Sequence, residues 1–232
     1  MMKKAVVTGA SSGIGKAITH SLLKLGYEVI GVSRTIKKDD FNDKHFRPLQ
    51  VDLSNEKETL LACGNLKNED IYILVNCAGF GRFEPHEELK PHAIISMMFL
   101  NLTAPLLLSN ALLRTLKQNS GYLINISSIE ALRASKFAGV YSATKAGLKA
   151  FGDSLFEETR KSKLSVTNIN PDMTQSSFYD ELRFDVSDKE DEKLLASDIA
   201  DAIKHILTIR KGAVVSEYTL RSLKFGIKKK KF

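Results

Sequence analysis

The chain has 232 residues, 43% of them hydrophobic, and a formal net charge of +7, which is enough for one large domain with a substantial core. It contains no run of 18 apolar residues that would suggest a membrane span, and its N-terminus has neither the apolar region nor the cleavage site of a signal peptide. The two cysteines, Cys63 and Cys77, do not make a disulfide framework, so we expect reduced thiols and a cytoplasmic protein. No histidine or cysteine has metal-ligand spacing, so we expect no metal site.

Strand-like and helix-like patterns alternate along the chain. Strands are predicted at residues 3–8, 27–33, 46–52, 71–76, 121–127, 164–170 and 212–220, and helices at 13–26, from 54 onward, and at 92–117, 139–161 and 197–207. Pro105 predicts a kink or an interruption in the longest helix, and Ser197 is the expected N-cap of the last one. This alternation predicts a single α/β domain, 1–232, whose mostly parallel seven-stranded sheet carries helices on both faces.

Two segments lie outside the alternation. Residues 172–195 are irregular, and a connection of that length in a compact domain is often a mobile substrate lid, although an ordinary surface excursion is the alternative. Residues 226–232 hold four lysines in a row and are interpreted as a solvated, frayed tail. A weak interaction of this tail with polyanions is the other reading. Elsewhere the basic residues are mixed with acids, so we expect no nucleic-acid partner.

A glycine-rich turn, TGASSGIG, joins the first strand to the first helix. Gly9, Gly13 and Gly15 would let the backbone turn sharply and approach a pyrophosphate. The N-terminus of the helix then offers free N–H groups and the positive end of its dipole to the anion. The spacing departs from G-x-G-x-x-G, and a tight turn without a ligand is the alternative.

The end of the second strand indicates which dinucleotide is bound. A protein that binds NAD usually has an acidic residue there for the ribose hydroxyl, whereas this chain has Ser33 and Arg34. Because a guanidinium pairs with a phosphate in bidentate fashion, Arg34 favours the 2′-phosphate of NADP, unless it is a simple surface arginine. Asp52, after the third strand, could accept a hydrogen bond from the adenine amino group or cap the following helix.

Tyr141 and Lys145 are four residues apart in a predicted helix, so their side chains share one face. A tyrosine has a pKa near 10, and a neighbouring ammonium favours the phenolate. At about 4 Å and an effective dielectric constant near 20, the attraction is roughly 4 kcal/mol, which would lower the pKa by up to about 3 units before screening by solvent. The pair therefore predicts a proton donor or acceptor, against the alternative of a packing tyrosine beside an exposed lysine.

Two further polar residues are candidates for the same site. Ser128 follows the strand at 121–127, at the carboxyl edge of the sheet where ligands bind, and its hydroxyl could stabilise a developing alkoxide. Asn101 is an unfavourable residue for a helix interior and could hold a water that links Lys145 to solvent. Taken alone, they could equally be a loop hydroxyl and a polar core residue.

Together these residues resemble the short-chain dehydrogenase/reductase family over essentially the whole chain. The matching motifs are TGASSGIG (8–15), DL (52–53), NCAG (76–79), Asn101, Ser128, YSATK (141–145) and NPDMTQS (170–176). The resemblance implies a doubly wound, Rossmann-type sheet and a nicotinamide cofactor. It also implies an Asn-Ser-Tyr-Lys tetrad in which Tyr141 exchanges the proton and Ser128 orients the substrate oxygen. In this scheme Lys145 lowers the tyrosine pKa and binds the nicotinamide ribose, and Asn101 maintains the proton relay.

The resemblance also implies the contacts, the partners and the reaction. The residues expected to hold the cofactor are Gly9, Ser11, Ser12, Gly13, Ile14, Gly15, Ser33, Arg34, Asp52, Leu53, Asn76, Ala78, Gly79, Tyr141, Lys145, Pro171 and Thr174. The cofactor is expected to be NADP(H) rather than NAD(H), and the partners a small-molecule substrate and one or three further copies of the chain. The expected reaction is hydride transfer between nicotinamide and a small alcohol or carbonyl, with a 3-hydroxy acid as one candidate. A non-catalytic, cofactor-sensing or regulatory protein on the same fold is the alternative.

Three positions depart from the family pattern. Cys77 replaces an asparagine, where a small thiol would serve as a packing substitute. Asp172 replaces the glycine that usually follows Pro171; it tolerates a left-handed backbone and would place a charge near the nicotinamide. Ser12 stands where members that prefer NADP often carry a base, so that preference rests on Arg34 alone.

Overall fold

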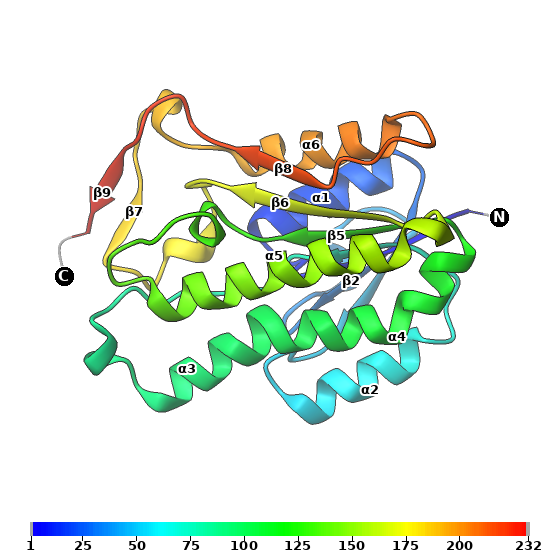
Figure 1. Cartoon of the computed structure of the whole chain (residues 1–232), viewed down its shortest axis with the longest axis horizontal. Coiled ribbons are helices and arrows are strands. Elements are labelled where there is room, and N and C mark those ends of the chain that lie inside the picture. Colours follow the sequence, from blue (N-terminus) through cyan, green and yellow to red (C-terminus); the bar gives the residue numbers. More distant parts are fainter. Residues whose placement is uncertain (1, 231–232) are drawn as a thin grey trace.

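A seven-stranded parallel sheet in the order β3-β2-β1-β4-β5-β6-β8 forms the centre of this computed structural model, which describes residues 2–230 (Figure 1). The strands are Lys4–Thr8 (β1), Glu28–Ser33 (β2), Phe46–Gln50 (β3), Ile71–Asn76 (β4), Tyr122–Ile126 (β5), Ser165–Pro171 (β6) and Glu217–Leu220 (β8). All seven predicted strands are therefore present, although the third and the last are shorter than expected. The order reverses direction between β1 and β4, which opens a crevice at the carboxyl ends of the strands.

Helices cover both faces of the sheet, as the alternation predicts (Figure 1). They are Gly13–Lys24 (α1), Glu56–Leu66 (α2), Pro91–Met98 (α3), Ala104–Gln118 (α4), Gly139–Thr159 (α5) and Ala196–Thr208 (α6). Ile18 of α1 and Ile203 of α6 are buried in one core cluster, while Leu112 of α4 and Leu155 of α5 are buried in the other. The doubly wound arrangement follows from these two apolar layers.

The longest predicted helix is interrupted, as Pro105 indicates. A turn of π-helix, Phe99–Thr103, separates α3 from α4, and Pro105 lies in the first turn of α4. Because proline has no N–H, it cannot donate the usual α-helical hydrogen bond to the carbonyl of Asn101, four residues earlier. Single π turns of this kind occur frequently at functional sites.

The same stretch is apolar enough to resemble a membrane span. Among the described residues, Pro91–Gln118 is long enough, and an 18-residue window within it has a mean hydropathy of 1.5. Leu108, Leu112 and Leu116 are nevertheless completely buried in the core cluster that includes β4 and β5. Packing against the core therefore accounts for part of the apolar character of this stretch, since 33% of that window is buried.

The start of the last helix differs from the prediction. Helix α6 begins at Ala196, and Leu195, not Ser197, is its N-cap residue. The Asp198 carboxylate accepts the hydrogen bond from the Leu195 N–H at 2.8 Å. The carboxylate of Asp198, in the first turn, thus caps the helix in place of the Ser197 hydroxyl.

The C-terminal tail is also different from the expected frayed end. Ile227–Lys229 form a strand, β9, which pairs antiparallel with Phe184–Val186, β7, inside the irregular 172–195 segment (Figure 1). The two segments that fall outside the β-α alternation therefore pair with each other. The last two residues of the predicted tail, 231–232, lie outside the described residues.

Candidate active site

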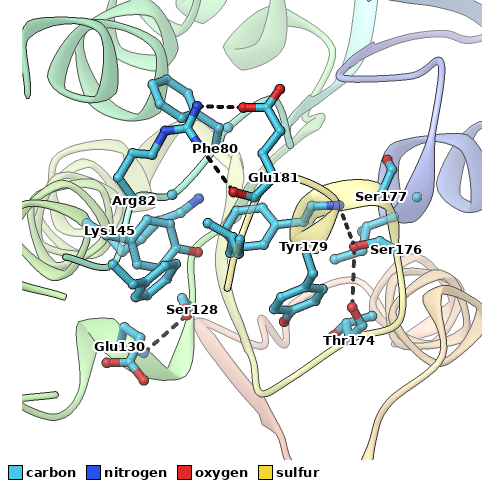
Figure 2. A pocket seen from close by; sticks show the side chains of 18 of the residues that line it. Phe80, Arg82, Ser128, Glu130, Lys145, Thr174, Ser176, Ser177, Tyr179 and Glu181 are labelled. Atoms are coloured by element: carbon cyan, nitrogen blue, oxygen red, sulfur yellow. Dashed lines mark hydrogen bonds and ion pairs between the residues drawn. The ribbon is translucent and has the colours of Figure 1, made fainter. Parts of the chain in front are cut away.

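A cleft of about 1260 Å³ opens at the carboxyl ends of the parallel strands. Its walls come from the loops after β1, β2, β4 and β5 and from the 172–195 segment. Figure 2 shows Ser128 and Lys145 on one side of this cleft, and Thr174 and Tyr179 on the other. Of the residues predicted to bind the cofactor or act in catalysis, all line the cleft except Asn76 and Asn101.

The glycine turn brings the backbone close to the neighbouring loop. Gly9 and Gly13 have φ of +69° and +49°, in the left-handed region that favours glycine. A Cβ atom on Gly9 would lie 3.0 Å from the Cα of Ala78. Ser12 is the N-cap residue of α1, but its side chain makes no capping hydrogen bond. The first N–H groups of α1 therefore remain available at the cleft, an arrangement that fits an anionic phosphate.

Thr8 is a site residue that the sequence analysis missed. Its Oγ1 accepts hydrogen bonds from the backbone N–H groups of Cys77 at 2.9 Å and Ala78 at 3.0 Å. The last residue of β1 thus fixes the loop after β4 against the glycine turn. The position of Thr8 immediately before Gly9 is the signal that could have identified it. Cys77 itself is partly buried and packs against the core cluster, and burial raises the pKa of its thiol to about 12.

The end of β2 carries a small polar cluster beside Arg34. The Ser33 hydroxyl donates to the Ser11 hydroxyl at 2.8 Å, which joins the loop after β2 to the glycine turn. Arg34 is exposed at the cleft. Burial acts to raise the pKa of Asp52, but hydrogen bonds from Ser54 and the charge of Arg34 outweigh it, so the pKa is lowered. Asp52 also caps the turn before α2, since its Oδ1 accepts from the Ser54 hydroxyl and N–H.

Asn76 belongs to the core and not to the cleft. Its Nδ2 donates to Asn125 Oδ1 at 3.0 Å and to Ser109 Oγ at 3.3 Å. Asn125 in turn donates to Asn168 at 3.1 Å, which makes a buried row of amides across β4, β5 and β6. The first residue of the NCAG motif therefore ties neighbouring strands together, and its side chain is buried and does not line the cleft where the cofactor was expected.

Tyr141 and Lys145 lie in α5, and both side chains reach the cleft although they are 7% and 4% exposed. The Lys145 Nζ lies 5.8 Å from the centre of the Tyr141 ring and donates to the Ile126 carbonyl at 2.9 Å. The helical spacing thus gives the expected shared face. The hydrogen bond to β5 holds the ammonium at the carboxyl end of the sheet.

The protonation of this pair differs from the expectation. Burial raises the pKa of Tyr141 above its usual value, the Ser128 hydroxyl offsets part of the rise, and the Glu130 carboxylate adds to it. Burial also lowers the pKa of Lys145 to about 8. In the free protein, loss of water therefore outweighs any acidifying effect of the ammonium on the phenol. At neutral pH the phenol of Tyr141 is consequently protonated.

Ser128 is oriented by its own turn. Its Oγ accepts the backbone N–H of Glu130 at 3.2 Å (Figure 2). Because that bond uses an acceptor site of the hydroxyl, the O–H proton is left to donate toward the cleft. This is the property required of a group that stabilises a substrate oxygen.

Asn101 is buried outside the cleft and contacts the loop that lines it. Its Nδ2 donates to the Phe80 carbonyl at 2.8 Å and to the Thr144 hydroxyl at 3.2 Å, and its Oδ1 accepts from the Phe80 N–H at 3.0 Å. A Cβ atom on Gly79 would lie 3.1 Å from Asn101 Oδ1 and 3.5 Å from Lys145 Nζ. The side chain of Asn101 therefore holds the loop after β4 against α5.

The charge of Asp172 is balanced by an ion pair with Arg221. Its Oδ2 accepts from Arg221 Nε at 3.2 Å, and its side chain is almost completely buried. Asp172 does not adopt the left-handed backbone that was expected for a replacement of glycine. Its charge next to the cleft is balanced by an arginine that follows β8.

Known proteins resemble this chain over most of its length. A family model described as short chain dehydrogenase matches residues 3–187. An uncharacterized oxidoreductase of Staphylococcus aureus is 32% identical over 227 residues, which cover 94% of this chain and 96% of that protein. A second uncharacterized oxidoreductase, from Staphylococcus haemolyticus, is 33% identical over 229 residues, with the same two coverages, 94% and 96%.

Solved structures share the fold. An alcohol dehydrogenase from the archaeon Thermococcus sibiricus, complexed with 5-hydroxy-NADP, has a TM-score of 0.85 and 26% identity, and the match covers 96% of this chain and 97% of that one. A 4-hydroxyisoleucine dehydrogenase complexed with NADH has a TM-score of 0.82 and 23% identity, with coverages of 95% and 97%. The family match, the relatives and the fold agree, and the chain belongs to the short chain dehydrogenase family.

Proposed function

We propose that the protein is an NADP(H)-dependent oxidoreductase that interconverts a small alcohol and the corresponding carbonyl compound. The observation that carries this proposal is one cleft that holds both the uncapped N-terminus of α1 and the buried Tyr141–Lys145 pair with Ser128. A phosphate-binding end and a proton-donating end in a single cleft are what hydride transfer to a carbonyl requires.

The chain's own residues account for the proton and for the substrate oxygen. A nicotinamide bound in the cleft would supply or accept the hydride. In the direction of reduction, the Tyr141 hydroxyl donates its proton to the substrate oxygen while the Ser128 O–H donates a hydrogen bond to the same oxygen. The Lys145 ammonium then stabilises the phenolate that remains. Because the pKa of Tyr141 is raised in the free protein, the phenol is ready to donate a proton at neutral pH.

The preference for NADP rests on Arg34. It is exposed at the cleft beside Ser11 and Ser33. The end of β2 has no acidic residue that could accept a hydrogen bond from a ribose 2′-hydroxyl. Proteins of this fold have been solved with 5-hydroxy-NADP and with NADH, so the fold alone does not choose between them. A guanidinium at this place supports the phosphorylated ribose.

The experiment that tests this function is a panel of small carbonyl compounds and alcohols, including 3-hydroxy acids, assayed with NADPH, NADP⁺ and their NAD counterparts. Turnover with NADPH and a carbonyl compound is the expected result. A rise in melting temperature with NADPH but no turnover of any substrate would favour the cofactor-sensing alternative. Turnover with NADH alone would remove the role proposed for Arg34.

We also propose that the protein works as a homodimer or homotetramer in the cytoplasm. The cysteine content is compatible with a reducing compartment, since two cysteines, Cys63 and Cys77, do not make a disulfide framework. Light scattering on the purified protein would test the assembly, and a monomer at micromolar concentration would contradict it.

A further inference from the structure

The lysines at the C-terminus alternate between two faces of the β7–β9 ribbon. In the antiparallel register Lys229 lies opposite Phe184, and Lys228 lies opposite Asp185. Directly opposed residues point to the same face of a ribbon. Lys229 and Phe184 both line the cleft, so one face of the ribbon is turned to the site and the other face is turned away.

On the outer face, lysines form ion pairs with aspartates of the 172–195 segment. Lys230 pairs with Asp185 at 3.4 Å and Lys228 pairs with Asp188 at 2.8 Å. A third pair, Lys224 with Asp191 at 2.6 Å, lies just before the ribbon. The basic end of the chain is thus matched, lysine by aspartate, to the acidic part of the 172–195 segment.

Lys230 reaches furthest into that segment. Its Nζ also donates to the carbonyl of Tyr179 and, at 3.4 Å, to that of Asp180. These carbonyls end the short 3₁₀ turn Ser177–Tyr179. The Lys230 side chain is 25% exposed, so its bonds are better shielded from water and salt than those of the outer pairs.

The turn held by Lys230 contacts the catalytic tyrosine. The ring of Phe178 lies 5.7 Å from that of Tyr141, and the ring of Phe83 lies 5.2 Å from Tyr141 and 5.2 Å from Phe184 of β7. Aromatic contacts therefore run from the ribbon to the site of proton transfer. A further tie, the ion pair between Arg82 and Glu181, links the same segment to the loop after β4 (Figure 2).

We propose that residues 224–230 form a clasp that fixes the 172–195 segment over the substrate end of the cleft, with Lys230 as its principal positioning residue. The clasp sets the affinity for substrate by holding Phe178 and Phe184 in the wall of the pocket. None of the residues 224–230 is among those assigned to proton transfer or to cofactor binding, so we expect the clasp to act on the affinity for substrate. The kinetic consequences rest on the proposed function, whereas the structural consequences do not.

The test compares Lys230→Met with Lys211→Met. Lys211 is an exposed lysine in the loop between α6 and β8. In Figure 1 that loop lies at the end of the molecule opposite β9. Hydrogen exchange is measured by mass spectrometry on residues 177–192, without any ligand. We expect Lys230→Met to speed exchange there about tenfold, the size expected when hydrogen bonds from one charged group are lost, and Lys211→Met to leave it unchanged. Equal exchange in the two variants would overturn the proposal.

Kinetics then separates this proposal from the function itself. With a substrate from the panel, Lys230→Met should raise KM about tenfold while kcat and the affinity for NADPH stay within about twofold of the parent.

Deletion of residues 224–232 should raise KM at least as much. Raising the salt from about 0.05 M to about 0.5 M should raise KM for the parent but not for the deletion variant. Faster exchange with no turnover by the parent protein would contradict the proposed function and leave the clasp standing. An unchanged KM in both variants would contradict the clasp's role in substrate affinity.

Discussion

The Lys145 ammonium donates to the Ile126 carbonyl at 2.9 Å while its Nζ lies 5.8 Å from the centre of the Tyr141 ring. The lysine is thus held by β5, with its ammonium over the ring of the phenol. The two buried groups are therefore pushed in opposite directions: the pKa of the phenol is raised and that of the ammonium is lowered. Both shifts favour the neutral forms, which is the signature of desolvation.

Replacement of the tyrosine tests the proton donor. Tyr141→Phe removes the hydroxyl but keeps the ring, so packing against Phe83 and Phe178 is retained. We expect kcat to fall by a factor of about 10² to 10⁴, the usual contribution of a positioned general acid, while NADPH still raises the melting temperature. Tyr218→Phe, on β8, is the matched control and should keep the parent rate. Unchanged turnover by Tyr141→Phe would eliminate this residue as the donor.

The pH dependence should report Lys145. As the pH rises through about 8, Lys145 loses its proton in the free enzyme, and the phenolate left by proton transfer loses the positive charge that stabilises it. We therefore expect kcat/KM for carbonyl reduction to be level below about pH 8 and to fall about tenfold per pH unit above it. Tyr141 does not produce this fall, because its pKa is raised still further above that range. A profile that stays level to pH 10 would contradict the assignment.

Arg34 should control the choice of dinucleotide. Arg34→Gln removes a charge-assisted pair with the 2′-phosphate, which is worth about 1.5–3 kcal/mol, or a factor of roughly 10 to 100 in Kd. The Kd for NADH should change by less than about twofold, since NADH has no such phosphate. Calorimetric titration of both dinucleotides checks this, with Arg210→Gln as a distant control. Equal weakening of the two dinucleotides would mean that Arg34 acts through the fold.

Asn76 should matter for stability and not for binding. Asn76→Ala leaves the acceptor Asn125 Oδ1 without its donor in the core, and a buried unpaired polar group costs about 1–3 kcal/mol. Urea denaturation should therefore show a loss of that size in the free energy of unfolding. The Kd for NADPH should remain within about twofold of the parent. A large loss of NADPH affinity with unchanged stability would restore the cofactor contact that the motif implied.

Patterns that depend on local physics predicted most of the fold and much of the site. Runs of apolar residues predicted all seven strands of the sheet, and Pro105 predicted the break between α3 and α4. Both predictions succeeded because hydrophobic periodicity and a missing N–H group depend only on a residue and its neighbours in the sequence. Gly9 and Gly13 were predicted to adopt special backbone conformations for the same reason. The i, i+4 spacing was enough to bring Tyr141 and Lys145 to one cleft.

The role of a polar side chain was harder to predict, because it depends on which residues distant in the sequence surround it. Asn76 belongs to a motif, yet its partners are Ser109 and Asn125, which no local pattern connects to it. Asp172 is balanced by Arg221, forty-nine positions further along the chain. Thr8 was missed because its importance lies in the two N–H groups that it accepts from the loop after β4.

The amino-acid sequence by itself determined the alternation of strands and helices, the glycine turn and the placement of Tyr141 and Lys145 on one helix face, since each arises from residue type and short-range spacing. Only the tertiary structure decided the protonation of Tyr141 and Lys145, because desolvation depends on how completely the fold excludes water. It also decided that the terminal lysines pair with the acids at 185–191, because attraction between charges is set by their separation in space and not along the chain.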